Sequence, residues 1–159
     1  MNDLGKCVEN WEPRDKCLEF ADMLSYVQLP DMSVGDPGRT HDAVKKLFDA
    51  LQQRFKVTKI IKLVARDNLS RPMPDKDIAR FVKQFDIEDL DWEKYNMDLD
   101  PFRQSTEHGS SSQLCKLRLY STGHWGVIHH WTSLDEGIYT LKEVSIAYCR
   151  ISPLVATAN

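Results

Sequence analysis

Residues 60–65 read I-I-K-L-V-A, and the same spacing of apolar residues returns at residues 87–92 (I-E-D-L-D-W), 114–119 (L-C-K-L-R-L) and 141–146 (L-K-E-V-S-I). The first, fourth and sixth positions are apolar in all four segments, which begin 27 residues apart. In a chain that is 42% hydrophobic, twelve such matches arise by chance about once in 10³ when period and phase are chosen freely. The pattern therefore indicates four repeated units, each containing one strand.

The polar positions between the apolar ones test this register. If equivalent strands lie side by side about 4.8 Å apart, these positions form rows across the sheet. The rows are Lys62, Asp89, Lys116 and Glu143; Val64, Asp91, Arg118 and Ser145; and Arg66, Glu93, Tyr120 and Ala147. The charge alternates along the whole first row, and opposite charges on neighbouring strands contribute about 0.2–1 kcal/mol per pair. The alternation therefore supports the 27-residue register.

Helical patterns fall between these strands, which predicts an α/β order of strand, crossover and parallel strand. Thr40 is a predicted N-cap for a helix that continues to Arg54. The other predicted elements are strand 57–66, helix 75–84, strand 87–93, a turn or short helix near 99–103, strand 114–120, helix 133–140 and strand 141–147. Residues 123–131 carry no clear pattern. The alternative fold is a ferredoxin-like α+β sandwich, but the acidic Asp89, Asp91 and Glu93 oppose its RNA-recognition form.

An amphipathic helix is expected at residues 13–28, because Pro13 suits a first helical position and apolar residues follow at three- and four-residue spacing. We expect this helix to act as a lid over the open end of the array, since terminal units need capping. A partner-binding helix is the alternative. The domains are then residues 1–40 as capping helix and linker, 41–151 as repeat domain and 152–159 as tail.

The motif L-x-x-L-x-L, followed two residues later by N or C, resembles the leucine-rich repeat. The N/C position is occupied by Asn68 in the first unit and Cys149 in the fourth, but by Tyr95 and Thr122 in the other two. The resemblance implies a short solenoid of parallel strands in which this polar side chain hydrogen-bonds the turn backbone. An irregular array of four such units is the expected fold.

Charge and composition exclude several classes of function. The net charge of −3 and the pI near 5.9 argue against general binding of nucleic acid or anionic membranes. No segment reaches the ~18 apolar residues of a membrane span. No C-x-x-C pair occurs among the cysteines, so free thiols in a reducing, cytoplasmic compartment are expected. The cysteines are Cys7, Cys17, Cys115 and Cys149.

The predicted function is protein recognition without catalysis, because the open face of a parallel array is a wide, rigid binding surface. The alternative is that the charges on this face only pair with one another. Tyr120 is the residue to test first, since aromatic residues dominate contact energies. The predicted binding face is Lys62, Arg66, Asp89, Asp91, Glu93, Lys116, Arg118 and Tyr120. The partner is expected to be another protein or another domain of the same protein.

Histidines provide the rival hypothesis of a small hydrolase or a metal-dependent enzyme. His108 precedes Gly109 in a serine-containing loop, but no nucleophile segment accompanies it. The segment 120–131 contains His124, His129 and His130, which with Cys115 or Cys149 would supply zinc ligands. Packing of Trp125 and Trp131 is the simpler explanation of that segment. We therefore expect no catalytic residue, metal ion or cofactor.

A second resemblance involves L-D-W at residues 90–92, L-R-L-Y at 117–120, S-T-G at 121–123, W-T-S at 131–133 and the G-I that begins the predicted helix at 137. Together these are similar to a region ahead of the catalytic domain in some filamentous-fungal subtilisin-like proteases. It implies a non-catalytic recognition segment at the front of a larger protein. The last strand would also be an exposed edge, which predicts a covering tail, a longer protein or self-association.

Overall fold

The computed structural model describes residues 22–34, 36–104, 113–141 and 144–151, and these residues form an α/β structure. The five strands are β1 (Met23–Gln28), β2 (Lys59–Arg66), β3 (Asp89–Tyr95), β4 (Lys116–Ser121) and β5 (Ile146–Ile151). The helices are α2 (Pro37–Gln53), α3 (Asp75–Gln84), α4 (Asp100–Gln104), α5 (Trp125–Thr132) and the 3-10 turn η1 (Ile138–Thr140). Strands and helices therefore alternate along the chain.

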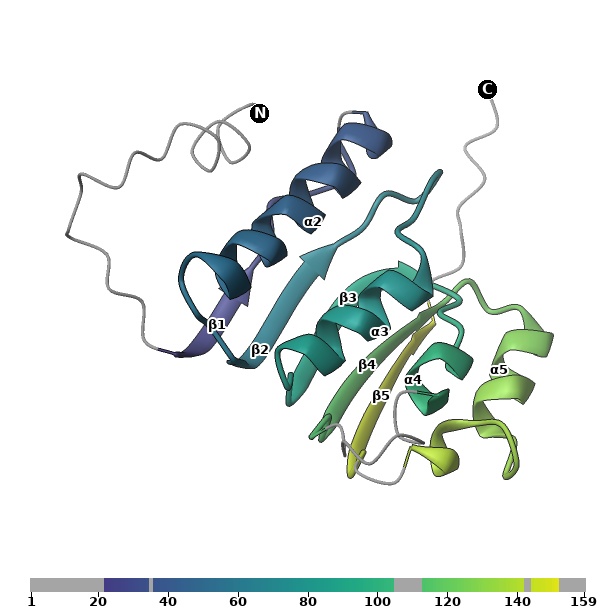
Figure 1. Ribbon diagram of the computed structural model, residues 1–159. Helices are drawn as coiled ribbons and strands as arrows, with labels where there is room; N and C mark the ends of the chain where they lie inside the picture. Colours follow the sequence, from purple (N-terminus) through teal and green to yellow (C-terminus); the bar gives the residue numbers. More distant parts are fainter. Residues whose placement is uncertain (1–21, 35, 105–112, 142–143, 152–159) are drawn as a thin grey trace.

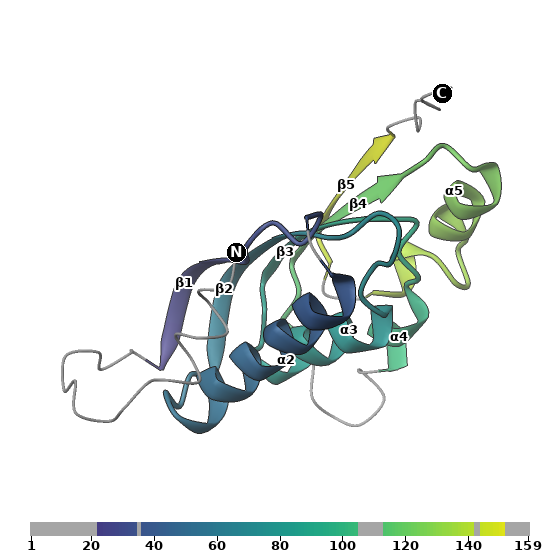
Figure 2. The same cartoon turned by 90° about the horizontal axis from the view of Figure 1, so that it is seen from above.

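All five strands are parallel, and their order in the sheet is their order in the sequence, β1-β2-β3-β4-β5. Crossovers between parallel strands share one hand, so crossovers that all step in one direction place their helices on one face. Figures 1 and 2 show α2, α3 and α4 on that face, with α5 beyond α4 at the β5 end. The parallel sheet excludes the ferredoxin-like sandwich, whose sheet is antiparallel.

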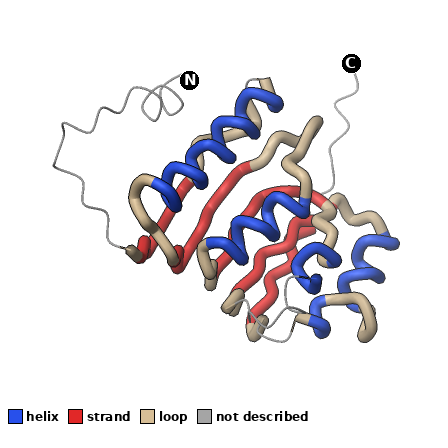
Figure 3. The backbone as a smooth tube through the Cα atoms, viewed as in Figure 1, coloured by secondary structure: helices blue, strands red, loops and turns tan. Residues whose placement is uncertain are grey.

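The core lies between the sheet and these helices. Figure 3 shows the two layers, with the helices in blue against the strands in red. The repeated apolar positions of the first three units are all buried. They are Ile60, Leu63, Ala65, Ile87, Leu90, Trp92, Leu114, Leu117 and Leu119. The helices contribute Phe48 of α2 and Phe81 of α3, whose rings stack with centroids 4.2 Å apart. These contacts attach the two longest helices to the sheet and to each other.

The predicted register holds across β2, β3 and the first half of β4. Lys62 pairs with Asp89 and Asp89 with Lys116, while Val64, Asp91 and Arg118 form the second row. The prediction for the third row is correct for Arg66 and Glu93 but wrong for Tyr120. A bulge between Asp91 and Tyr95 inserts extra residues into β3, so Tyr120 pairs with Tyr95 instead.

The fourth predicted strand also differs from the structure. Leu141 is buried and Val144 packs partly against the core, as the repeat pattern expects. However, the Val144 N–H donates to the Leu141 carbonyl at 3.0 Å, and the strand begins only at Ile146. Lys116 consequently pairs with Ile146 and not with Glu143, which lies outside the described residues. The expected helix at 133–140 is reduced to η1.

The prediction of an N-terminal lid helix at residues 13–28 is wrong for its C-terminal part. Residues 23–28 form β1 and pair with β2, so that Leu24 lies beside Ile60 and Val27 beside Leu63. The remainder of the predicted helix, residues 13–21, lies outside the described residues, as does the tail at 152–159. Helix α2 begins earlier than expected, because Asp36 and not Thr40 caps it by accepting a hydrogen bond from Gly38 N at 3.0 Å.

The two expected turn positions have opposite outcomes. Asn68 follows β2, and its Oδ1 accepts hydrogen bonds from the backbone N–H groups of Ser70 and Arg71 at 3.0 Å. Its amide also donates to the carbonyls of Met32 and Ser33 in the preceding unit, at 3.4 Å. Cys149, by contrast, lies within β5 and pairs with Leu119, so it has no turn role.

Candidate functional site

The sheet face that points away from the helices is called the open face below, and no helix of the described chain covers it (Figure 2). All-parallel sheets are almost always covered on both faces and are then apolar on both. Here the open face carries the charged rows, because the apolar side chains of β2, β3 and β4 alternate toward the helices. The eight predicted binding-face residues all lie on these three strands.

Ion pairs connect the central part of the open face. Arg118 Nη1 lies 2.7 Å from Asp91 Oδ2 and 3.6 Å from Asp89 Oδ1. Lys62 Nζ lies 3.6 Å from Asp89 Oδ2 on the other side. These side chains remain partly exposed, and such pairs contribute only about 0–1 kcal/mol each. The alternating charges along the rows therefore form ion pairs, and these ion pairs make only a small contribution to stability.

Tyr120 lies within this network. Its hydroxyl donates to Asp91 Oδ1 at 2.6 Å, and only 9% of the residue is exposed. Burial raises the pKa of the Tyr120 hydroxyl, and the hydrogen bond to Asp91 adds to the shift. The bulge in β3 explains this position, since it places the Tyr120 ring edge-on to Tyr95 with centroids 6.5 Å apart. Tyr120 is thus a packed member of the face and not its exposed aromatic contact.

A second set of ion pairs lies toward β1. Arg66 approaches Asp31 Oδ2 at 3.5 Å and Glu93 Oε2 at 3.6 Å, although 62% of its side chain is exposed. The hydroxyl and N–H of Ser33 hydrogen-bond the Asp31 carboxylate and lower its pKa. Arg66 is therefore held by carboxylates from two different units.

Besides Arg66, the open face has accessible side chains on β1, β4 and β5. Lys116 and Arg150 are exposed and form no ion pair with another described residue. Tyr26 on β1 is 54% exposed and lies beside Lys62 in the sheet. The sequence does not point to Tyr26 or Arg150, because its spacing predicts a helix at residues 13–28 and a fourth strand that ends at residue 147. The accessible charges of this face are thus basic.

The histidine candidates are separated in the structure. His108 and the serines at 110–112 lie outside the described residues. His124 precedes α5 and His129 lies within it, both exposed, whereas Trp131 is buried and donates through Nε1 to the Met97 carbonyl at 2.9 Å. The described cysteines, Cys115 and Cys149, are free thiols and do not gather with these histidines.

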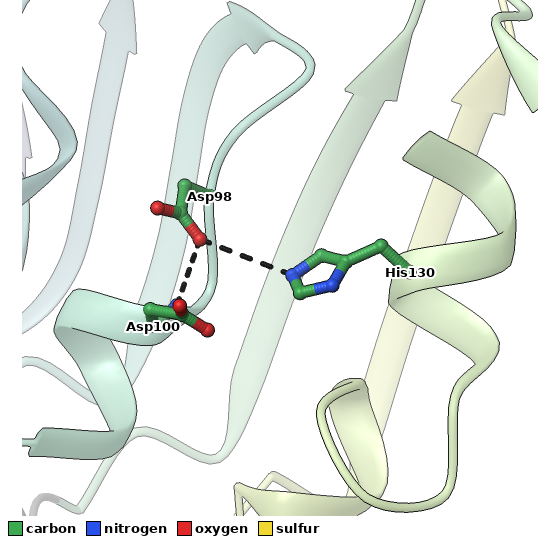
Figure 4. A group of neighbouring side chains, drawn as sticks. All are labelled: Asp98, Asp100 and His130. Atoms are coloured by element: carbon green, nitrogen blue, oxygen red, sulfur yellow. Dashed lines mark hydrogen bonds and ion pairs between the residues drawn. The ribbon is translucent and has the colours of Figure 1, made fainter. Parts of the chain in front are cut away.

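Among the described residues, one group has metal-ligating atoms within 4.8 Å of one another: Asp98, Asp100 and His130. Figure 4 shows Asp98 on the segment after β3, Asp100 at the start of α4, and the imidazole of His130 reaching toward them from α5. His130 Nε2 lies 3.9 Å from Asp98 Oδ1, and Asp100 N donates to the same oxygen at 3.0 Å. The spacing of Asp98 and Asp100 is visible in the sequence, but their approach to His130 is not.

Comparison of the chain with protein-family models, curated proteins and solved structures found no match. No described helix is long and apolar enough to cross a membrane. The function must therefore be argued from the geometry of the open face and of the loops at its edge.

Proposed function

We propose that this chain is a non-catalytic protein-recognition module with a leucine-rich-repeat-like architecture, and that its open face binds a partner protein. The single observation that carries the proposal is the uncovered parallel sheet face with its polar surface. In solenoid proteins such a face forms an extended binding surface. The Asn68 hydrogen bonds to the turn backbone and the sequential strand order support the architecture.

The charge distribution indicates what the partner presents. The carboxylates of Asp89, Asp91 and Glu93 already face Arg118, Lys62 or Arg66. Lys116 on β4 is exposed without such a partner among the described residues, and so is Arg150 on β5. A partner with an acidic surface is therefore complementary to Lys116 and Arg150. Binding of that partner weakens as salt screens the charges.

Tyr26 supplies the aromatic contact at the opposite edge. Large aromatic side chains contribute a disproportionate share of interface energy when a partner covers them. The tyrosine is already more than half exposed on a strand, so its burial needs no rearrangement of the core. The partner surface therefore extends from β1 to the β4 and β5 side.

The test compares three forms of the full chain as immobilised baits in lysate from its source. The first is the wild type, the second carries Tyr26→Ala and Lys116→Glu, and the third carries Tyr139→Ala and Lys83→Glu. The third is a matched control, because Tyr139 and Lys83 are exposed but lie on the helix side. Circular dichroism verifies that all three are folded.

The expected result is that wild type and control retain the same proteins, whereas the open-face variant loses them. The amount of protein retained should also decrease as the salt concentration rises from about 50 to about 300 mM, because salt screens surface charges. If all three baits retain the same proteins, the open face is not the binding surface and the proposal fails. If the partner is another domain of a longer protein, coexpression of that domain with the same variants gives the equivalent comparison.

A further inference from the structure

The loop that follows β3 and the helix that follows β4 meet at one edge of the sheet. Asp98 lies in that loop, Asp100 is the first residue of α4 at its end, and His130 belongs to α5. The carboxyl ends of parallel strands are where α/β proteins bind ligands, because the loops there converge. This group is separate from the charged rows of the open face, since its helix α5 belongs to the other layer.

A buried hydrogen bond fixes the two segments against each other. Trp131, the neighbour of His130, is 2% exposed and donates through Nε1 to the carbonyl of Met97, the neighbour of Asp98, at 2.9 Å. Met97 and Leu99 are themselves buried at 1% and 0% exposure. Every one of the three ligating residues therefore adjoins a buried residue, so the backbone that carries these ligands is rigid.

The outer contacts of the group orient its side chains. Glu136 Oε2 lies 3.7 Å from His130 Nδ1, so a carboxylate faces the ring nitrogen opposite the one that points at Asp98. Metal-binding histidines commonly present their second nitrogen to a carboxylate in this way. Arg103 donates to Asp100 Oδ1, which holds that side chain and leaves its second oxygen available.

We propose that Asp98, Asp100 and His130 bind one divalent transition-metal ion of the Zn²⁺ class. One imidazole nitrogen and two carboxylate oxygens suit zinc, whereas magnesium and calcium favour ligand sets made of oxygen alone. Ligands about 2.0–2.2 Å from a tetrahedral zinc ion lie about 3.4 Å apart. The ligating atoms are already within 4.8 Å, and rotation of the half-exposed carboxylates closes the difference.

The bound ion links α5 to the loop after β3 and to Asp100, the first residue of α4. Two hydrogen bonds lie beside it: Trp131 of α5 donates to the Met97 carbonyl, and Arg103 of α4 donates to the carbonyl of Asp135, which follows α5, at 3.3 Å. An ion that binds only the folded chain stabilises it by mass action. The site therefore acts as a metal clasp at the β5 end of the array, and it involves no chemical step.

The experiment uses the full chain with all four cysteines changed to serine, because thiolates are themselves zinc ligands. Titration calorimetry with Zn²⁺ and with Mg²⁺ measures binding, and a thermal melt measures the shift in Tm. The variants are His130→Gln and Asp98→Asn, and the matched control is His129→Gln on the same helix. All three positions are at least partly exposed, so these substitutions preserve the fold.

The expected result is one Zn²⁺ bound per chain, a raised Tm with zinc and no comparable effect of Mg²⁺. His130→Gln and Asp98→Asn should each weaken zinc binding at least about tenfold, whereas His129→Gln should match its parent. The proposal is overturned if the parent shows no saturable binding of a single ion. It is equally overturned if His130→Gln binds as tightly as the parent, because the ion then lies elsewhere.

Discussion

Trp92 Nε1 donates a hydrogen bond of 2.8 Å to Asp67 Oδ2, and both side chains are buried between two neighbouring units of the sheet. The Asp67 carboxylate also accepts from the backbone N–H of Asn68 at 2.8 Å and of Met73 at 3.0 Å. His41 of α2 lies 3.7 Å from it. The Asp67 carboxylate thus accepts hydrogen bonds from two backbone N–H groups of the turn between β2 and α3. Its hydrogen bond from Trp92 connects that turn to β3.

Replacing Asp67 by alanine should lower the free energy of unfolding by at least about 3 kcal/mol, because three buried donors lose their acceptor at roughly 1–3 kcal/mol each. Asp67→Asn retains one acceptor oxygen and should cost less. Urea denaturation with an unchanged m-value measures the difference. Asp42→Ala, at an exposed position of α2, is the control and should change stability by less than about 0.5 kcal/mol. Equal midpoints for the Asp67 and Asp42 variants would contradict this role.

Phe81 fills the contact between α2 and α3, where it stacks on Phe48 and is fully buried. Phe81→Ala should destabilise the chain by about 3–5 kcal/mol, from lost burial and the cavity left behind. A double-mutant cycle with Phe48→Leu should reveal a coupling of about 0.5–1.5 kcal/mol between the rings. Additive effects in that cycle would show that the stacking contributes nothing beyond burial. Lys76→Ala on the exposed side of α3 provides the baseline.

Tyr120→Phe removes the hydrogen bond to Asp91 and should cost about 1–2 kcal/mol at pH 8, since the acceptor is charged. The folded protein raises the pKa of this hydroxyl above the unfolded value of about 10. The contribution of the hydroxyl is therefore complete below pH 10 and is lost as the pH rises above it. The stability difference between wild type and variant should shrink between pH 8 and pH 11. A constant difference over that range would show that the hydroxyl does not titrate as described.

Lys94 is 7% exposed on the helix side of β3, and its Nζ lies 2.7 Å from both the Met73 carbonyl and Asp75 Oδ1. Burial raises the pKa of the Asp75 carboxyl despite this lysine. Breaking a buried ion pair costs roughly 3–5 kcal/mol of stability. Lys94→Met should lower the free energy of unfolding by an amount near the lower end of this range, because Asp75 retains some exposure. The double change Lys94→Met with Asp75→Leu should recover part of that loss. A double variant less stable than Lys94→Met alone would rule out an uncompensated charge as the cause.

The middle of the fold was predictable from the sequence. The repeated apolar positions must be buried on one side, and a one-residue slip would turn each strand over, so the register of Leu63, Leu90 and Leu117 followed from their spacing. The helix at 75–84 was predicted with its observed bounds, because Ile78, Phe81 and Val82 share one face. The ends of the array were less certain, since local spacing there fits more than one structure.

Residues 23–28 illustrate that ambiguity. Leu24 and Val27 are three residues apart, as on a helix face, but Ile60 and Leu63 of β2 have the same spacing, and the two pairs lie side by side. Only the neighbouring strand distinguishes the two conformations, because an isolated segment gains nothing from sheet pairing. The β4–β5 register likewise departs from the repeat, because β5 begins at Ile146 and Lys116 pairs with it, which no periodic pattern specifies.

Periodicity in the sequence is enough to predict which side chains of β2, β3 and β4 face the core, that these strands run parallel, and that the first two polar rows lie together across them. These follow from chain connectivity and from the cost of exposing apolar surface, both of which are local and periodic. Only the tertiary structure decided that β1 completes the sheet, that Tyr120 hydrogen-bonds to Asp91, and that His130 meets Asp98 and Asp100. These contacts fall outside the 27-residue period and depend on how loops close and helices dock, and no local pattern encodes that geometry.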